Sequence, residues 1–374
     1  MFIIKKLVIS LFTVILTAAF CIDGVHADFT QEISARSAIV IDADSGQILY
    51  EKNSGESMLI ASTTKILTAL VVIDRCPLDD IVTVGEESAS VEGSSMYLTA
   101  GEQLTVKELL YGLLMESGND AAAALAIHAA GSIEAFADMM NAKAQELGCD
   151  GSHFENPHGL DAQEHYSCAK DLAIITSEAM KNKIFSDIVS TKTASVGGRS
   201  FSNHNKLLWQ YDGAVGVKTG YTMAAGRILV SAVSKEGMEL ICVTISAPDD
   251  WDDHTKLYDW ALSEYRCITV SDDSLGEITV PVISGVRDSV TVKVLSVRKL
   301  LIKADEEPEF KYVLPKFIYA PVKTGSYAGQ VKVFCGGQEL CALELWYCDG
   351  SELDKNAELT RWQRIKRSWL FLKG

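Results

Sequence analysis

The chain has 374 residues, of which 48% are hydrophobic, and it carries a formal net charge of −16. This length exceeds that of one average domain, and the apolar content suffices to bury a core, so we expect two domains and short terminal segments. The acidic balance disfavours nucleic acid as a partner, because phosphate binding needs a basic face.

The N-terminus has the pattern of a secretory signal peptide. Two lysines precede an apolar run from Leu7 to Ile22, and a small-residue cleavage pattern ends at Ala27. We therefore expect residues 1–27 to be removed and the rest of the chain to be exported. The alternative is an uncleaved membrane anchor, which would also place the body outside the membrane.

Residues 28–266 have the pattern of one α+β domain. Residues 37–52 predict a strand hairpin, and residues 214–247 predict an antiparallel meander of three strands. Helical patterns lie between them, at residues 63–74, where nearly every residue is apolar or small, and at 106–115, 120–130 and 133–147; a last helix at 252–265 would close the domain. This order predicts a sandwich whose antiparallel sheet gathers strands from both ends of the domain.

The remaining chain predicts a small all-β domain and a tail. Short alternating runs separated by Gly, Pro and Asp fill residues 267–352. Residues 353–374 combine an apolar stripe at helical spacing with basic residues between, which suits the headgroup layer of an anionic membrane. The alternative is a terminal helix docked on its own domain. The stripe is Leu359, Trp362, Ile365, Trp369 and Leu372, and the basic residues are Arg361, Arg364, Lys366, Arg367 and Lys373.

The nine cysteines form no CxxC pair and have no histidine at a metal-binding spacing. We therefore expect no metal site and no redox motif. Export would permit disulfides, but their connectivity stays open, and several cysteines lie in apolar runs where a buried thiol is the ordinary outcome.

Ser62-Thr63-Thr64-Lys65 stands at the start of the predicted apolar helix. Residues three apart on a helix share a face, so Lys65 can reach the Ser62 hydroxyl. Desolvation would lower the pKa of this lysine and make a neutral amine available as a base. By itself the tetrapeptide is equally typical of a serine that caps a helix, followed by a solvated lysine.

Two further short motifs follow in the same domain. Ser117-Gly118-Asn119 lies between two predicted helices, where it could present a hydroxyl and an amide or merely form a tight turn. Lys218-Thr219-Gly220 lies on a predicted strand, where Gly220 would let a substrate backbone approach and pair. The same tripeptide recurs at residues 323–325, where the flanking residues predict a hairpin turn, so the tripeptide alone is not diagnostic.

The order of SxxK, an SDN-type element and KTG within one domain is the signature of penicillin-binding proteins and class A β-lactamases. The chain resembles the low-molecular-weight penicillin-binding proteins, which are serine-type D-Ala-D-Ala carboxypeptidases, over nearly its whole length. SGN in place of SDN is the form that this subfamily usually shows. The resemblance implies the β-lactamase/transpeptidase-like α/β sandwich, and it makes His158 and His204, in Asn156–Asp161 and Asn203–Leu208, walls of the cleft.

The resemblance also implies the roles of the site residues. Ser62 would be the nucleophile and Lys65 its base, with Ser117 relaying a proton and Asn119 holding Lys65 and the substrate. Lys218 would supply positive charge near Ser117 and, with Thr219, would bind the terminal carboxylate. The backbone N–H groups of Ser62 and Tyr221 would form the oxyanion hole. The substrate would be a peptidoglycan stem peptide ending in D-Ala-D-Ala, penicillins would trap Ser62, and no cofactor is implied.

Three other functions use the same residues. A class A β-lactamase would need a loop carboxylate to activate water, for which Glu155 and Asp161 are the candidates in the middle loop. An endopeptidase or transpeptidase would use the same machinery. A non-catalytic β-lactam sensor would be acylated without releasing D-alanine. We expect the carboxypeptidase, on the outer face of the cytoplasmic membrane.

Overall fold

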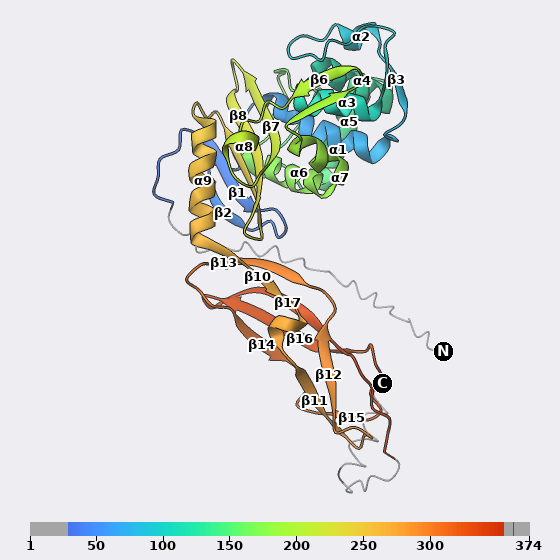
Figure 1. Cartoon of the computed structure of the whole chain (residues 1–374), viewed down its shortest axis with the longest axis vertical. Coiled ribbons are helices and arrows are strands. Elements are labelled where there is room, and N and C mark those ends of the chain that lie inside the picture. Colours follow the sequence, from blue (N-terminus) through green and yellow to red (C-terminus); the bar gives the residue numbers. More distant parts are fainter. Residues whose placement is uncertain (1–28, 355–361, 363–374) are drawn as a thin grey trace, which may run out of the picture.

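The computed structural model describes residues 29–354 and Trp362, so the predicted signal peptide and most of the predicted tail lie outside the described residues. Figure 1 shows two parts along the long axis, an α+β part above and a β-sheet part below. Within residues 29–354, no helix is both long enough and apolar enough to cross a bilayer.

The first part is built on a five-stranded antiparallel sheet. Its strands are β1 (Ser37–Asp42), β2 (Ile48–Lys52), β7 (Ala214–Thr222), β8 (Gly226–Lys235) and β9 (Met238–Ile245). Their order is β2-β1-β9-β8-β7, which joins the N-terminal hairpin to the later meander through β1 and β9. This confirms the prediction that the sheet gathers strands from both ends of the domain.

Alternating side chains of the sheet enter two different cores. Ile39 and Ile41 of β1 face the helical layer, whereas Ala38 and Val40 face α9 (Asp250–Glu264). Both sets are at most 4% exposed, so the central strands are buried on both faces. In Figure 1 α9 covers one side of the sheet and the large layer of helices covers the other.

The helical layer contains the predicted helices and several that were not predicted. The predicted ones are α1 (Lys65–Arg75), α3 (Val106–Met115), α4 (Asn119–Ala130) and α5 (Ile133–Glu146). The others are α2 (Glu86–Ala89), α6 (Ala169–Lys181) and α7 (Lys183–Ser190), whereas α8 (Leu207–Gln210) places Leu207 in the core around α9. Short pairs β3 (Ile81–Thr83) with β4 (Gln103–Thr105) and β5 (Thr193–Val196) with β6 (Arg199–Ser202) lie at its margin.

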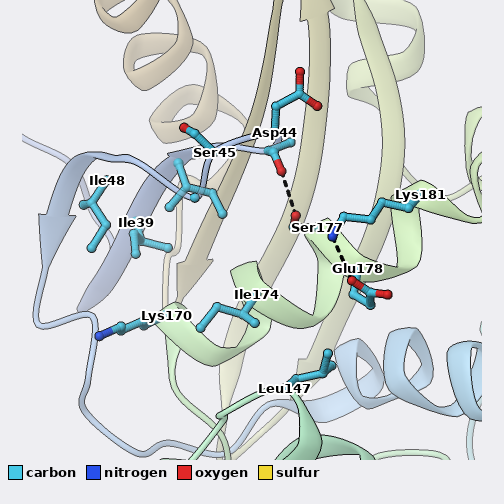
Figure 2. Close-up of a pocket in the computed structure, with 13 residues that line it drawn as sticks. Ile39, Asp44, Ser45, Ile48, Leu147, Lys170, Ile174, Ser177, Glu178 and Lys181 are labelled. Atoms are coloured by element: carbon cyan, nitrogen blue, oxygen red, sulfur yellow. Dashed lines mark hydrogen bonds and ion pairs between the residues drawn. The ribbon is translucent and has the colours of Figure 1, made fainter. Parts of the chain in front are cut away.

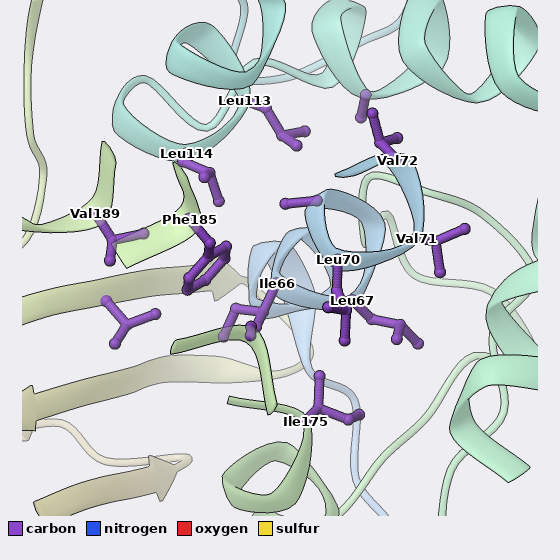
Figure 3. Packing of buried hydrophobic residues seen from close by; sticks show 14 of the residues in the cluster. Ile66, Leu67, Leu70, Val71, Val72, Leu113, Leu114, Ile175, Phe185 and Val189 are labelled. Carbon is purple, nitrogen blue, oxygen red and sulfur yellow. The ribbon is translucent and has the colours of Figure 1, made fainter. Parts of the chain in front are cut away.

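Helix α1 runs through the centre of this layer. Every residue from Lys65 to Val72 is buried, as its apolar sequence predicted. Figure 3 shows Ile66, Leu67 and Leu70 surrounded by side chains from other helices, among them Leu113, Ile175 and Phe185. The N-terminus of α1 is therefore held from several sides.

The second part is an all-β domain with its own core. It contains β10 (Tyr265–Val270), β11 (Ile278–Ile283), β12 (Ser289–Val294), β13 (Arg298–Lys303), β14 (Glu309–Val313), β15 (Ile318–Tyr319), β16 (Tyr327–Cys335), β17 (Gln338–Tyr347) and the short α10 (Asp272–Leu275). Six strands form one sheet in the order β14-β16-β17-β12-β11-β15, and β10 pairs with β13.

The two parts are joined without a linker. Helix α9 ends at Glu264 and β10 begins at Tyr265. Leu301 of β13 packs in the same core as α9, so this core contains residues from both sides of the junction.

Candidate active site

Ser62 lies in a 3-10 turn, Ala61–Thr64, immediately before α1. The sequence predicted a helix over residues 63–74 with Ser62 at its start, and the α-helix α1 begins two residues later than predicted, at Lys65. The predicted pairing nevertheless holds, since residues i and i+3 also align in a 3-10 turn. Ser62 is half-buried, Lys65 is fully buried, and the Lys65 Nζ lies 2.9 Å from the Ser62 Oγ.

The Lys65 amine has three neighbours. Besides Ser62, its Nζ contacts Asn119 Oδ1 at 2.7 Å and the backbone carbonyl of His158 at 2.6 Å. These two oxygens can only accept hydrogen bonds. A neutral amine must therefore direct two protons at them, which leaves its lone pair for the proton of Ser62. Burial, and next the charge of Lys218, lower the pKa of Lys65 well below its usual value, which favours this neutral form.

The SGN motif forms the turn between α3 and α4. Ser117 has a φ of +61°, a backbone conformation that serine seldom adopts, and it is 4% exposed. Its Oγ is buried without a hydrogen-bond partner among the described residues, which leaves the hydroxyl available to a substrate. Asn119, the first residue of α4, is fixed by a 2.5 Å hydrogen bond from its Nδ2 to the carbonyl of Glu92.

The KTG motif lies on β7, at the edge of the sheet. Lys218 and Gly220 pair with Val230 and Ile228, whose side chains belong to the core of the helical layer, so both motif residues face that side. A Cβ on Gly220 would lie 3.3 Å from the backbone nitrogen of Ser62, so glycine permits β7 to pass close to the nucleophile. Burial lowers the pKa of Lys218 to about 7.

Thr219 and Tyr221 have the opposite parity on β7. Thr219 pairs with Leu229, which belongs to the core around α9, and it is half-buried. Tyr221 is 64% exposed. Among the described residues β7 pairs only with β8, so its outer edge can receive an extended peptide.

A sequence comparison gives the family. Residues 24–249 match the sequence profile described as D-alanyl-D-alanine carboxypeptidase, peptidase family S11. The chain belongs to this family. It is therefore a serine hydrolase of the penicillin-binding-protein type that acts in peptidoglycan metabolism.

Individual carboxypeptidases and solved structures resemble this chain to different extents. D-alanyl-D-alanine carboxypeptidase DacF of Bacillus subtilis is 38% identical over 62% of this chain and 63% of its own length. DacC of Escherichia coli is 32% identical over 82% of both chains. The structure of penicillin-binding protein 5 from Haemophilus influenzae matches 87% of this chain and all of its own with a TM-score of 0.73 at 28% identity. Because this match covers 87% of the chain, it includes the β-sheet domain as well as the α+β part.

Both histidines that the family resemblance singled out lie near the carboxypeptidase motifs. His158 contributes its carbonyl to Lys65, and its Nδ1 accepts a 3.3 Å hydrogen bond from Leu160 N. Burial lowers the pKa of His158 to about 3. His204 lies 3.4 Å from Glu116, the residue before Ser117, and burial, followed by the charge of Lys218, lowers the pKa of its ring.

Sequence reasoning missed two residues that support the site. Asp120 accepts hydrogen bonds from Ser95 Oγ, Met96 N and Leu98 N and so fixes the loop before β4. His165 is 1% exposed and contacts Thr64 within the SxxK motif. Asp120 directly follows SGN and could have been noticed, whereas nothing near His165 in sequence indicates its partner.

The second KTG tripeptide lies outside the site. Residues 323–325 form a turn before β16, in which Gly325 has a φ of +75° and donates its N–H to the carbonyl of Tyr347. The predicted turn is present, but it is not a hairpin turn, because the preceding β15 and the following β16 are not neighbours in the sheet.

A groove of about 260 Å³ lies between the β1–β2 hairpin and α6. Figure 2 shows Ile39, Ile48 and Ile174 lining it, with Lys170 at one end and Lys181 beside Glu178 at the other. None of the residues predicted for the catalytic site lines this groove.

The cysteines of the described residues are all free thiols. Cys149, Cys168, Cys242 and Cys335 are buried, and Cys348 is exposed. The buried ones agree with the prediction that cysteines in apolar runs would be core residues.

Proposed function

We propose that this chain removes the terminal D-alanine from peptidoglycan stem peptides through an acyl-enzyme on Ser62. The observation that carries the proposal is the environment of Lys65. Its buried amine lies 2.9 Å from Ser62 Oγ, and two oxygens, Asn119 Oδ1 and His158 O, accept hydrogen bonds from its N–H groups. A neutral lysine so held is a base directed at one hydroxyl.

In the proposed acylation, Ser62 Oγ attacks the carbonyl carbon of the penultimate D-alanine while Lys65 takes the hydroxyl proton. The N–H groups of Ser62 and Tyr221 stabilise the oxyanion of the tetrahedral intermediate. Ser117, whose Oγ is otherwise unpartnered among the described residues, relays the proton that Lys65 took from Ser62 to the departing nitrogen, the C–N bond breaks, and Lys65 is neutral again. Water then attacks the ester carbonyl while Lys65 takes one of its protons. That proton passes to Ser62 Oγ as the ester C–O bond breaks, which regenerates Ser62 and Lys65.

The proposed substrate contact is an anchored extended peptide. Lys218 binds the terminal carboxylate, because a charge-assisted contact suits a substrate that ends at the site. Thr219, whose side chain has the opposite parity on β7, adds its contact from the open edge of that strand. His158 and His204 form walls of the cleft. The open edge of β7, with the small Gly220 facing Ser62, supports pairing with the substrate backbone.

Penicillins resemble the D-Ala-D-Ala terminus and would acylate Ser62 as a slowly hydrolysed ester. Rapid hydrolysis, as in a class A β-lactamase, would need a carboxylate that activates water. Glu155 accepts a hydrogen bond from Glu164 N, and Asp161 accepts one from Thr222 Oγ1. Neither carboxylate contacts Ser62 or Lys65 within residues 29–354, which favours the carboxypeptidase.

We also propose how the chain is organised outside the cell membrane. Residues 1–27 are the signal peptide, 28–266 the catalytic domain, 267–352 the β-rich domain and 353–374 a tail that lies on an anionic membrane surface. Strand β10 crosses the proposed boundary at residue 266. The enzyme would then act on the outer face of the cytoplasmic membrane.

The decisive experiment follows free D-alanine released from an acyl-D-Ala-D-Ala peptide. The mature chain should release D-alanine, and the Ser62→Ala variant should release none. Labelled penicillin should bind the parent and not the variant. Labelling without D-alanine release would indicate a sensor, fast penicillin hydrolysis would indicate a β-lactamase, and transfer to an added amine would indicate a transpeptidase.

A further inference from the structure

The residue before the nucleophile, Ala61, has an unusual backbone conformation. Ala61 has a φ of +44°, in the left-handed region that alanine rarely occupies, and it is 1% exposed. A strained residue persists only where its surroundings hold it. The peptide between Ala61 and Ser62 carries the backbone N–H of the nucleophile, so whatever holds it also sets the direction of that N–H.

A directed chain of hydrogen bonds ends on this peptide. The Thr64 hydroxyl donates to the carbonyl of Ala61 at 2.8 Å, and the same hydroxyl lies 2.8 Å from Nε2 of His165. The other ring nitrogen of His165, Nδ1, accepts the backbone N–H of Glu155 at 3.1 Å.

These contacts fix the proton positions. Because Nδ1 of His165 accepts, a neutral ring carries its proton on Nε2 and donates it to Thr64. The ring stays neutral because burial lowers the pKa of His165 to about 4. The hydroxyl of Thr64 accepts from the ring and passes its own proton to Ala61 O, so the chain runs in one direction from Glu155 N to the peptide.

Two glycines flank the same peptide. A Cβ on Gly159 would lie 1.9 Å from Ala61 O and 2.8 Å from Thr64 Oγ1, so only glycine leaves room for that hydrogen bond. A Cβ on Gly220 would lie 3.3 Å from Ser62 N. Gly159 therefore lies beside the carbonyl oxygen of the Ala61–Ser62 peptide, and Gly220 lies beside its nitrogen.

We propose that Thr64 and His165 are positioning residues that orient and polarise the Ser62 N–H as an oxyanion donor. The inference rests on the proposed function, in which that N–H stabilises the tetrahedral intermediate. In a trans peptide the C=O and N–H point in opposite directions, so a donor held on Ala61 O directs Ser62 N–H away from Thr64. Hydrogen bonding to the carbonyl also polarises the peptide and strengthens its N–H as a donor.

The first test compares Thr64→Val with Thr64→Ser in the full mature chain. Valine keeps the shape of threonine and removes the hydroxyl, whereas serine keeps the hydroxyl. Complete removal of an oxyanion donor costs on the order of a hundredfold or more in rate, so a weakened donor should cost about tenfold. We expect Thr64→Val to lower kcat of D-alanine release about tenfold with little change in KM, and Thr64→Ser to stay within about threefold of the parent.

A second variant and a second substrate separate positioning from a general structural effect. His165→Phe keeps a ring of similar size and removes both hydrogen bonds of the imidazole, so it should lower the rate in the same direction as Thr64→Val but by less, because Thr64 can still donate to Ala61 O. A substrate with sulfur in place of the scissile carbonyl oxygen depends less on the oxyanion donors. The oxygen-to-sulfur ratio of kcat/KM should therefore shrink in Thr64→Val and remain parental in Thr64→Ser.

The outcomes distinguish this inference from the proposed function. Penicillin acylation of Ser62 also passes through an oxyanion, so slower acylation in Thr64→Val supports the inference even if the parent released no D-alanine. The inference is overturned if Thr64→Val has the parental melting temperature, the parental rate of penicillin acylation and the parental oxygen-to-sulfur ratio of kcat/KM. The proposed function would stand in that case, because D-alanine release by the parent would still depend on Ser62. The inference is also overturned if all rates of Thr64→Val fall while its oxygen-to-sulfur ratio of kcat/KM stays at the parental value. That result would show that Thr64 has only a structural role.

Discussion

Two lysines with lowered pKa values lie in the same site, and the proposed mechanism requires one to be neutral and the other to be charged. Lys65 must be neutral to take the proton of Ser62, whereas Lys218 must be charged to hold a carboxylate. Both are buried, and the charge of Lys218 adds to burial in lowering the pKa of Lys65. Protonated Lys218 therefore helps Lys65 to stay neutral.

This arrangement predicts a bell-shaped pH profile for kcat/KM. The acid limb follows protonation of Lys65, and the alkaline limb follows loss of the Lys218 proton at a pKa of about 7. Lys218→Arg keeps its charge at higher pH, so the alkaline limb should move upward even though the maximal rate falls. Lys107→Arg, an exposed site on α3, is the matched control. If the alkaline limb of the kcat/KM profile does not move in Lys218→Arg, a group other than Lys218 controls that limb.

Sequence patterns could identify the motif residues but not their support. Ser62, Ser117 and Lys218 stand in short motifs whose order is diagnostic. His165 could not be found this way, because its contact with Thr64 spans 101 residues. Its role depends on which of its nitrogens accepts a hydrogen bond, and only the folded loop determines that.

At the scale of elements, helix α9 is attached to the sheet by a buried polar cluster. His254 lies 2.7 Å from Ser231 of β8 through Nδ1 and 2.9 Å from Thr244 of β9 through Nε2. Ser231 also lies 2.7 Å from the hydroxyl of Tyr258. These contacts join α9 to two strands of the sheet on the face opposite the active site.

This cluster predicts acid sensitivity of the fold. Burial lowers the pKa of His254 to about 3 from an ordinary 6.5, so the unfolded chain binds an extra proton between these values. Stability from this residue is complete above pH 6.5 and is lost as the pH falls toward 3, by up to about tenfold in the unfolding equilibrium per pH unit. His254→Gln should reduce the pH slope of the unfolding free energy in urea titrations. His128→Gln, at an exposed position near the end of the otherwise buried α4, is the control, and an equal change there would contradict the assignment.

The spacing of apolar residues along the sequence was enough to predict some helices and strands but not others. The apolar run of α1 predicted its burial, and alternation predicted β7, β8 and β9. Helix α6 was not predicted, although Leu172, Ile175 and Ala179 form a buried stripe at helical spacing that the sequence contains. The 3-10 turn at Ser62 could not be predicted, because it depends on the strained Ala61 and on the glycines packed around it.

At the scale of the whole molecule, the proposed tail carries basic charge on an otherwise acidic protein. Deleting residues 353–374 should abolish sedimentation of the protein with anionic lipid vesicles and leave D-alanine release from a soluble peptide unchanged. Neutral vesicles and raised salt, which weaken electrostatic attraction, should reduce binding of the full chain. Undiminished binding of the shortened chain would place the membrane contact elsewhere.

The β-rich second domain was predictable from its short alternating runs, but its attachment was not. Strand β10 follows α9 directly, and it pairs with β13, which is distant in sequence. No local pattern indicates that Leu301 would pack against α9.

That attachment limits how the molecule can move. Turning one domain against the other would expose Leu301 and Tyr265, and burying one such side chain is worth about 1.5–3 kcal/mol. The loss of this burial therefore opposes rotation at the junction between α9 and β10.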